Sequence, residues 1–325
     1  MAERPAIRQS LIRAMGRYGT LVALALLLAA FTIAAPSQFS TVDNLRNVLT
    51  DMSIGAIVAA GLTFPLVAGD FDLSIGYLAS FCGILVVGLM ERSGLSIPLA
   101  ILVVLVVGVA VGVMNGVVVT KLRVNAFIAT LGIGTLLVGF NYAYSGGIPI
   151  QLSDGGPFVR LTLGDVAGVP NLVILMVVAL ALLWTALNLT VRGQHIKATG
   201  ANPEAARRSG VPVDATRIAA FAIAGVCAAL TGVLLASNLG SGEVAAGDAY
   251  LLSSFAACFL GSAVLHDGRF HLVGTAVGVF TVAVGNNGLA ILGAPVFWQY
   301  VFSGGLLIVA VTLSSFSRRL SSEAT

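Results

Sequence analysis

Residues 97–144 read IPLAILVVLVVGVAVGVMNGVVVTKLRVNAFIATLGIGTLLVGFNYAY. Two long apolar runs stand on either side of a short turn, and the only charged residues in the stretch, Lys121 and Arg123, lie in that turn. About 20 mostly apolar residues are needed to cross the hydrocarbon core of a bilayer. The stretch therefore predicts a pair of membrane spans, 97–120 and 126–144.

The rest of the chain has the same apolar character. Of its 325 residues, 58% are hydrophobic and 10% are charged, and the mean hydropathy is +1.00. A soluble domain has about 45–50% apolar and about 25% charged residues, so this chain cannot cover itself with polar surface. The composition excludes secreted, nucleic-acid-binding and cytosolic enzyme classes, and it predicts an all-α polytopic membrane protein.

Apolar runs bounded by Gly, Pro, Asn or charged residues predict about ten transmembrane helices. They cover 18–35, 46–68, 73–90, 97–120, 126–144, 171–190, 216–238, 250–265, 269–290 and 297–315. Arginines precede the first run, as in a signal peptide, but nine further spans follow it, so an uncleaved anchor is expected. We expect a single transmembrane domain over 18–315, between an N-terminal segment, 1–17, and a tail, 316–325.

The positions of Lys and Arg predict the orientation of these spans. If the N-terminus is cytoplasmic, then of the 17 Lys and Arg residues only Arg46, Arg92 and Arg160 fall outside. Such an asymmetry is what the positive-inside rule requires of a correct topology. We therefore expect ten spans with both termini in the cytoplasm.

A short internal sequence similarity relates the two halves of the chain. Residues 68–73, AGDFDL, resemble residues 246–251, AGDAYL, and further matches follow each copy. The first copy follows a span that runs inward and the second follows a span that runs outward, which predicts inverted repeats with the transport pathway at their interface. Because Ala and Gly are abundant in this chain, chance similarity is the alternative.

The longest polar segment between spans is 191–215, which the charges place in the cytoplasm. Within it Asn202 is a good N-cap, Pro203 fits the first helical position, and Gly210 can end a helix in a left-handed conformation. These residues predict a helix of about two turns. A simple connector touching lipid headgroups is the alternative, but such a connector does not need caps at both ends.

This capped segment carries a family resemblance. Residues 200–211, GANPEAARRSGV, resemble the coupling-helix loop of the ribose-type permeases, the membrane subunits of bacterial ABC importers for sugars. Three more segments resemble that family in the same order: 68–76, AGDFDLSIG; Asn115-Gly116 with 123–132, RVNAFIATLG; and 287–289, NGL, before Trp298. The resemblance covers residues 45–315. The chain departs from the family pattern at Asp70, which adds an acid, and at 265–269, LHDGR.

The resemblance implies a permease in the bacterial inner membrane that translocates a neutral pentose or hexose and is not itself an enzyme. The implied partners are a cytoplasmic sugar-import ATPase that binds ATP and Mg, a periplasmic or lipid-anchored sugar-binding protein, and a second or homologous permease. The only lysines, Lys121 and Lys197, do not stand in a phosphate-binding loop, so ATP must bind to a partner. The implied ATPase-coupling residues are Gly200, Asn202, Pro203, Glu204, Ala205, Ala206, Arg207, Arg208 and Gly210.

Polar residues in or beside the spans are candidates for the translocation pathway, because amides and hydroxyls both donate to and accept from sugar hydroxyls. One aromatic residue, Phe127 of the family motif 123–132, is added to them. The candidates are Asp70, Asp72, Asn115, Asn125, Phe127, Thr130, Asn141, Asn286 and Asn287. Two other roles stay open at this point. Asp72 would serve as the N-cap of the following turn, and each Asn would bond only a neighbouring helix.

Two other classes of function compete with the importer. An ion-coupled secondary transporter would also have inverted repeats, and Asp70, Asp72 and Asp248 would then bind Na⁺ or H⁺. A membrane-embedded transferase would gather its acids at one face, whereas this sequence scatters them. The three histidines, His195, His266 and His271, do not have the spacing of a ligand set, so no metal site is expected.

Overall fold

The structure is a computed structural model that describes residues 3–262 and 268–322. Its helices are α1 (Glu3–Ala34), α2 (Pro36–Phe39), α3 (Val42–Ala68), α4 (Ile75–Glu91), α5 (Ile97–Thr120), α6 (Ala126–Ser145), α7 (Gly156–Leu163), α8 (Asn171–Leu189), α9 (Val191–Ala201), α10 (Pro203–Arg208), α11 (Val213–Leu239), α12 (Ala249–Ser262), α13 (Leu272–Ile291) and α14 (Phe297–Ser322). Two short antiparallel ladders join β1 (Ile150–Gln151) to β4 (Ser241–Gly242) and β2 (Asp165–Val166) to β3 (Val169–Pro170).

Each predicted span coincides with one apolar helix of the described chain. The span 97–120 has the same bounds as α5, while α1 and α14 extend into the segments predicted to flank the transmembrane domain. Among the described residues, six helices are long and apolar enough to cross a membrane, namely α3, α5, α6, α8, α11 and α13. The apolar parts of α1, α4, α12 and α14 are shorter, at 10–17 residues. The chain is thus a helical multi-pass membrane protein, and the number of ten crossings stays a prediction.

The segment 191–215 differs from the prediction, because it contains two helices where one was expected. α10 is the predicted helix: Asn202 Oδ1 accepts from the backbone N–H of Ala205 at 2.9 Å, and Gly210 has φ +83°. α9 was not predicted, because Gly193 and Gly200 lower its helix propensity. Gly200 lies against the backbone of Val67, where any Cβ would collide with the Val67 carbonyl. The glycine is there for close packing, not for flexibility.

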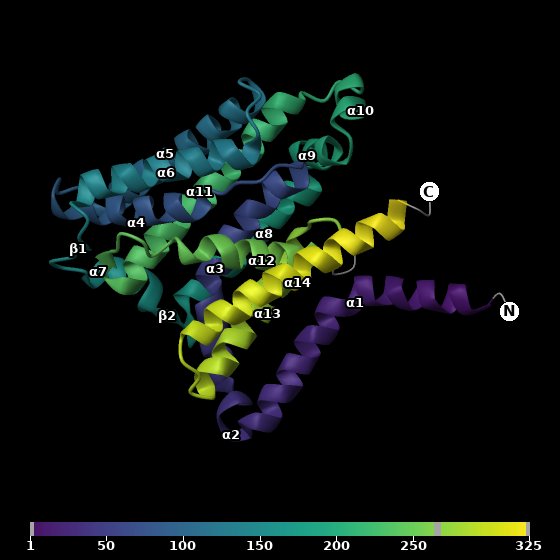
Figure 1. Cartoon of the computed structure of the whole chain (residues 1–325). Coiled ribbons are helices and arrows are strands. Elements are labelled where there is room, and N and C mark those ends of the chain that lie inside the picture. The colour runs from purple at the N-terminus through teal and green to yellow at the C-terminus, as the bar shows by residue number, and fades with distance from the viewer. Residues whose placement is uncertain (1–2, 263–267, 323–325) are drawn as a thin grey trace. The chain divides into compact units, whose positions relative to one another are not determined.

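The chain forms two compact units, and the larger one spans Ser53–Leu251. α11 is its central helix and packs against both α4 and α5, while α6 packs against α4 and α5 (Figure 1). The contact between α5 and α11 is made by small residues: a Cβ at Gly108, Gly112 or Gly225 would meet the backbone of the opposite helix. Lipid gives no hydrophobic driving force between helices, so such close van der Waals packing is what holds spans together.

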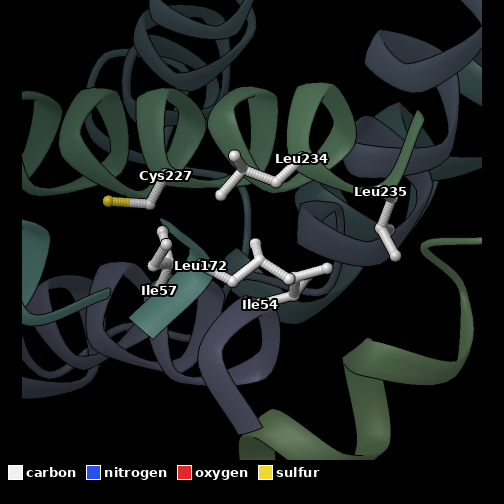
Figure 2. Packing of buried hydrophobic residues seen from close by; sticks show 6 residues of the cluster. All are labelled: Ile54, Ile57, Leu172, Cys227, Leu234 and Leu235. Atoms are coloured by element: carbon white, nitrogen blue, oxygen red, sulfur yellow. The ribbon is translucent and has the colours of Figure 1, made fainter. Parts of the chain in front are cut away.

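Another face of α11 packs against α3 and α8. Ile54 and Ile57 of α3 and Leu172 of α8 meet Cys227 and Leu234 of α11 in a buried cluster that also includes Leu235 (Figure 2). Gly61 of α3 lies against the Cβ of Cys227, so α3 also approaches α11 closely. α11 is therefore packed on both of these faces.

The smaller unit contains the residues up to Met52 together with those from Leu252 onward. α1, α13 and α14 pack against one another in it, with Phe31, Phe39, Val48 and Val284 in one buried cluster. A hydrogen bond between two helices adds to this packing. Thr20 Oγ1 of α1 donates to the Leu260 carbonyl of α12 at 2.8 Å.

Candidate transport and coupling site

The helical chain is interrupted between α3 and α4 by residues 69–74, which we call the break segment. Gly69 has φ +91°, a left-handed conformation that favours glycine, and Asp70 N–H donates back to the Pro65 carbonyl at 2.8 Å. Asp70 and Asp72 are both buried, with exposed fractions of 4% and 1%. In a membrane protein, non-helical backbone that is buried between spans must be satisfied by other protein groups or line a cavity.

Polar side chains of the neighbouring helices satisfy the break segment. Asp72 Oδ1 accepts from the backbone N–H of Ser74 at 2.9 Å and from its hydroxyl at 2.6 Å. Asn115 of α5 donates to the Ser74 hydroxyl at 2.7 Å, and Thr130 Oγ1 of α6 accepts from the Leu73 N–H at 3.0 Å. These bonds anchor α4 to α5 and α6 at the point where its backbone is interrupted.

The N-cap position predicted for Asp72 is wrong. α4 begins at Ile75 with Ser74 in the N-cap position, so Asp72 lies two residues earlier. Its carboxylate stabilises the turn that leads into the helix instead of the helix terminus. The sequence did not reveal this because Asp favours such a turn as strongly as it favours an N-cap.

Asp70 is the acid by which this chain departs from the family motif, and it forms an ion pair with Arg217. Arg217 Nε donates to Asp70 Oδ2 at 2.6 Å, and Nη2 donates to Oδ1, so the pair is bidentate. The Asp70 side chain is 5% exposed and the Arg217 side chain is 28% exposed. Arg217 stands near the start of α11, so this pair ties the break segment to the helix that follows α10.

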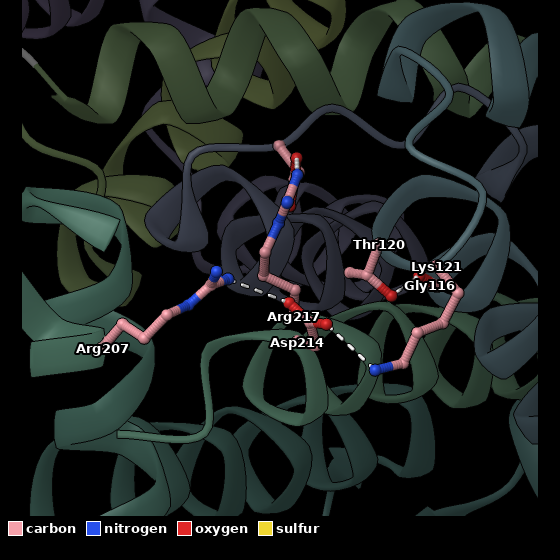
Figure 3. A network of polar contacts seen from close by, with 7 residues as sticks. Gly116, Thr120, Lys121, Arg207, Asp214 and Arg217 are labelled. Carbon is pink, nitrogen blue, oxygen red and sulfur yellow. Dashed lines mark hydrogen bonds and ion pairs between the residues drawn. The ribbon is translucent and has the colours of Figure 1, made fainter. Parts of the chain in front are cut away.

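A second charged group lies beside Arg217. Asp214 accepts from Lys121 at 3.0 Å and from Arg207 at 3.2 Å, and Figure 3 shows these two cations reaching it from different elements. Lys121 follows the end of α5 and Arg207 belongs to α10. The turn 121–125, α10 and the start of α11 therefore meet at one end of the larger unit, which we call the basic end.

The predicted coupling helix α10 is held at the basic end by α9. Gly200 of α9 lies against Val67, near the end of α3, and its Cα is the nearest atom that a Cβ on Gly69 would meet. Most of α10 is exposed, including Glu204 and Arg208, which pair across one helical turn at 3.3 Å. The helices on either side of α10 thus make two contacts, α9 with the end of α3 at Gly200 and α11 with the break segment through Arg217.

A second irregular segment, residues 240–248, connects α11 to α12, and we call it the return segment. Gly247 N–H donates to Ser80 Oγ at 2.9 Å, and that hydroxyl donates to Asp248 Oδ1 at 2.6 Å. A Cβ on Gly76 would lie 3.1 Å from the Gly247 carbonyl, so the return segment touches the first turns of α4. The two copies of the predicted repeat, 68–73 and 246–251, both fall where helices are interrupted.

The end of the larger unit at which α5 begins is distinct from the basic end, at which α5 stops. There Arg92 Nη1 donates to the Tyr144 carbonyl at 2.5 Å, and Glu91 accepts from Ser153 at 2.6 Å. The pairing of Ile150 with Gly242 brings the start of the return segment to the same end. Few cations lie here, because Arg92 and Arg160 are the ones that this part of the sequence supplies.

The predicted pathway residues do not form one cluster. Asn115, Thr130 and Asn141 are buried in the larger unit, where Asn141 donates to the Val244 carbonyl of the return segment at 2.8 Å. Asn286 and Asn287 belong to the smaller unit, where Asn287 donates to Asn44 at 2.9 Å. Four buried amide oxygens have no hydrogen-bond partner among the described residues: those of Asn115, Asn141, Asn286 and Asn287.

Asn125 and Phe127 line a cavity of about 630 Å³ at the basic end, which we call the basic cavity. Asn125 caps α6 by accepting from the Phe127 N–H at 2.9 Å. The complete lining is Gly69, Asp70, Phe71, Val119, Thr120, Arg123, Val124, Asn125, Ala126, Phe127, Arg207, Asp214 and Arg217.

Sequence reasoning missed Arg217, Asp214 and Ser80 as members of this site. The signal for Arg217 was its position: it stands among apolar residues in the first turns of α11, where an unpaired charge would be costly. Of the three histidines that were considered as metal ligands, His271 caps α13 by accepting from the Gly274 N–H at 3.0 Å. His266 lies outside the described residues, which contain no group of three or more His, Cys, Asp or Glu that would hold a metal.

The chain is a helical multi-pass membrane protein with two non-helical segments, 69–74 and 240–248, between helices of its larger unit and an exposed capped helix at one end. The chain matches the family model described as branched-chain amino acid transport system / permease component over residues 44–311, and it belongs to that family. It is a transport subunit and not an enzyme.

Several relatives resemble the chain over nearly its whole length. It is 34% identical to the ribose import permease protein RbsC of Haemophilus influenzae, covering 91% of this chain and 92% of that protein. It is 32% identical to the galactose/methyl galactoside import permease protein MglC of Escherichia coli, covering 95% and 96%. Identity to the L-arabinose transport system permease protein AraH of Escherichia coli is 33%, covering 94% and 93%. The predicted resemblance to ribose-type permeases is confirmed. No solved structure matches the chain.

Proposed function

We propose that the chain is the transmembrane permease subunit of an ATP-binding-cassette importer in the bacterial inner membrane, and that it translocates a neutral monosaccharide. The named relatives are permeases for ribose, galactose and arabinose, all neutral sugars. The observation that carries the proposal is the link from exposed α10 to the break segment. A mechanical link between an exposed helix and the interior of the permease is needed where another subunit delivers the energy for transport.

The proposed topology has ten spans with both termini in the cytoplasm, and inverted repeats. Contacts within the larger unit support the alternation of its loops. The turn 121–125 meets 191–217, while the segment after α4 meets the segment after α6, at the other end of α5. Cations are concentrated at the basic end, which makes that end the cytoplasmic one under the positive-inside rule.

The proposed coupling uses the two contacts between the α9–α10 region and the break segment. When the ATPase moves α10, the backbone contact of Gly200 with Val67 transmits the movement to the end of α3. The ion pair of Arg217 with Asp70 transmits movement of α11 to the same segment. The two contacts fall on the end of α3 and on the break segment that follows it, so this is the part of the permease whose position would follow the ATPase.

The substrate chemistry rests on neutral polar groups. Asn115 contacts the break segment and Asn141 contacts the return segment, and the side-chain oxygen of each lacks a donor. A sugar hydroxyl that reaches these oxygens would supply the missing donor. Both oxygens are shielded from solvent in this conformation, so the proposed pathway is closed at this depth and must open for transport.

The ion-coupled alternative is weaker because its three acids have other partners. Asp70 is neutralised by Arg217, Asp72 accepts from Ser74, and Asp248 accepts from Ser80. A cation site would need these carboxylates to converge on one point. They instead stabilise separate interruptions of the helices.

The proposed partners are a cytoplasmic sugar-import ATPase that binds ATP and Mg, an extracytoplasmic sugar-binding protein, and a second copy of this chain or a homologous permease. A test is to purify the permease with its ATPase and loaded binding protein, and to measure sugar uptake and ATP hydrolysis in vesicles. We expect uptake that requires ATP and is insensitive to an imposed Na⁺ or proton gradient. Accumulation driven by a gradient without ATP would contradict the proposal.

A variant pair tests the role of α10 directly. Replacing Glu204 and Arg207 together by Ala removes charges from the exposed helix, while Arg160→Ala removes a charge at the opposite end. The double variant should lose the stimulation of ATP hydrolysis by the loaded binding protein and still insert and fold, whereas Arg160→Ala should keep it. Retained stimulation in the double variant would remove the coupling assignment.

A further inference from the structure

The basic cavity carries an excess of positive charge, and its Arg123 has no part in the proposed coupling. It is lined by the guanidinium groups of Arg123, Arg207 and Arg217 and by two carboxylates. Both carboxylates are already paired, Asp70 with Arg217, and Asp214 with Arg207 and with Lys121. At about 630 Å³ the cavity has the volume of a small-ligand site.

Arg123 is the cation in the cavity that remains without a partner. No hydrogen bond or ion pair joins its side chain to another residue in the part of the chain that the structure describes. Its backbone has φ +55°, a left-handed conformation that L-residues other than Asn and Asp rarely adopt. Glycine would remove this strain, and strained residues of this kind cluster at ligand clamps.

Two further features suit an anion with an apolar attachment. Ala126 and Phe127 bring the N-terminus of α6, the positive end of its helix dipole, to the cavity wall. Phe71 and Phe127, which also line the cavity, are 40% and 53% exposed. The site stands at the end of α5, where a span meets the membrane surface.

We propose that the basic cavity binds a phosphate group, held by Arg123 with Arg207 and the N-terminus of α6, and supplied either by an anionic lipid headgroup or by a free phosphate. The planar guanidinium matches two phosphate oxygens at once. Basic pockets between spans on the cytoplasmic side are a recognised form of headgroup site.

The test uses the full-length permease in nanodiscs and measures its thermal unfolding temperature. Inorganic phosphate is added to nanodiscs of neutral phosphatidylcholine, with chloride at equal ionic strength as the control. In a second arm, nanodiscs that contain phosphatidylglycerol replace the neutral ones. A ligand that binds the folded state raises the unfolding temperature. Arg123→Gln should weaken this effect, with an apparent affinity about tenfold lower, and Arg160→Gln is the matched control.

The outcomes separate the possible sources. A response to inorganic phosphate that depends on Arg123 supports the proposal with a free phosphate as ligand, and a response confined to phosphatidylglycerol supports it with a lipid headgroup. Arg123→Gly relieves the backbone strain, so it should keep its unfolding temperature without ligand and still lose the response. Responses equal in wild type and Arg123→Gln overturn the proposal. Loss of ATPase-subunit binding by Arg123→Gln without any phosphate effect also overturns it, because Arg123 would then be a protein contact.

Discussion

Breaking the ion pair between Asp70 and Arg217 should destabilise the permease more than breaking any exposed pair at the same end. Asp70→Asn removes the carboxylate charge and leaves the guanidinium without its counterion. Removing one partner of a buried pair costs about 3–5 kcal/mol. Because the Arg217 side chain is 28% exposed and keeps some hydration, we expect a smaller loss, about 2–3 kcal/mol.

The measurement is a double-mutant cycle on the free energy of unfolding in nanodiscs or detergent. Asp70→Asn, Arg217→Gln and the double variant should show a coupling energy of about 1–3 kcal/mol, because the two residues share a bidentate contact. Asp214→Asn is the matched control, since its side chain is 36% exposed and its partners are 59% and 64% exposed, and it should cost about 0–1 kcal/mol. Additive effects at Asp70 and Arg217, within about 0.5 kcal/mol, would refute the reasoning.

Four further changes have expected outcomes. Gly210→Val forces a β-branched residue into a left-handed conformation, so both sugar uptake and the stimulation of ATP hydrolysis by the loaded binding protein should be lost. Normal stimulation would show that the end of α10 is not needed. Asp72→Asn should retain most uptake, because the amide oxygen still accepts from the turn, and a complete loss would favour an ion-binding role. Single Cys residues at Arg160 and Arg208, in a background without the native cysteines, should react with an impermeant thiol reagent from opposite sides of the membrane; labelling from one side would remove a span. Gly225→Ala places a Cβ against the α5 backbone and should lower stability by about 1–3 kcal/mol, as measured by thermal unfolding.

The helices that coincide with the predicted spans were predictable because local signals mark their ends. α5 begins beside Pro98 and stops before Lys121, and its predicted and observed bounds agree. α10 was equally clear, since its caps are local side-chain effects. The pairing of Asp70 with Arg217 joins residues 147 positions apart, and no local pattern encodes which acid an isolated arginine will meet.

The pathway candidates show a different limit of sequence reasoning. Asn115 and Thr130 were selected as polar residues inside spans, and both bind the break segment, Asn115 through the Ser74 hydroxyl and Thr130 through the Leu73 N–H. Polarity in a span indicates that a partner must exist, but it does not distinguish a substrate from a neighbouring segment of the chain. α9 escaped prediction for a related reason: glycines that permit close approach have the same appearance in a sequence as glycines that end a helix.

The glycine contacts between α5 and α11 have a mechanical consequence. Where two backbones touch, no side-chain layer is left to deform, so neither helix can slide or bend without its neighbour. α11 follows α10 after only the four residues 209–212, and a displacement of α10 is therefore expected to move both helices together. The compliant elements are then the non-helical segments on either side, and we expect a small displacement of α10 to reach the break segment almost undiminished.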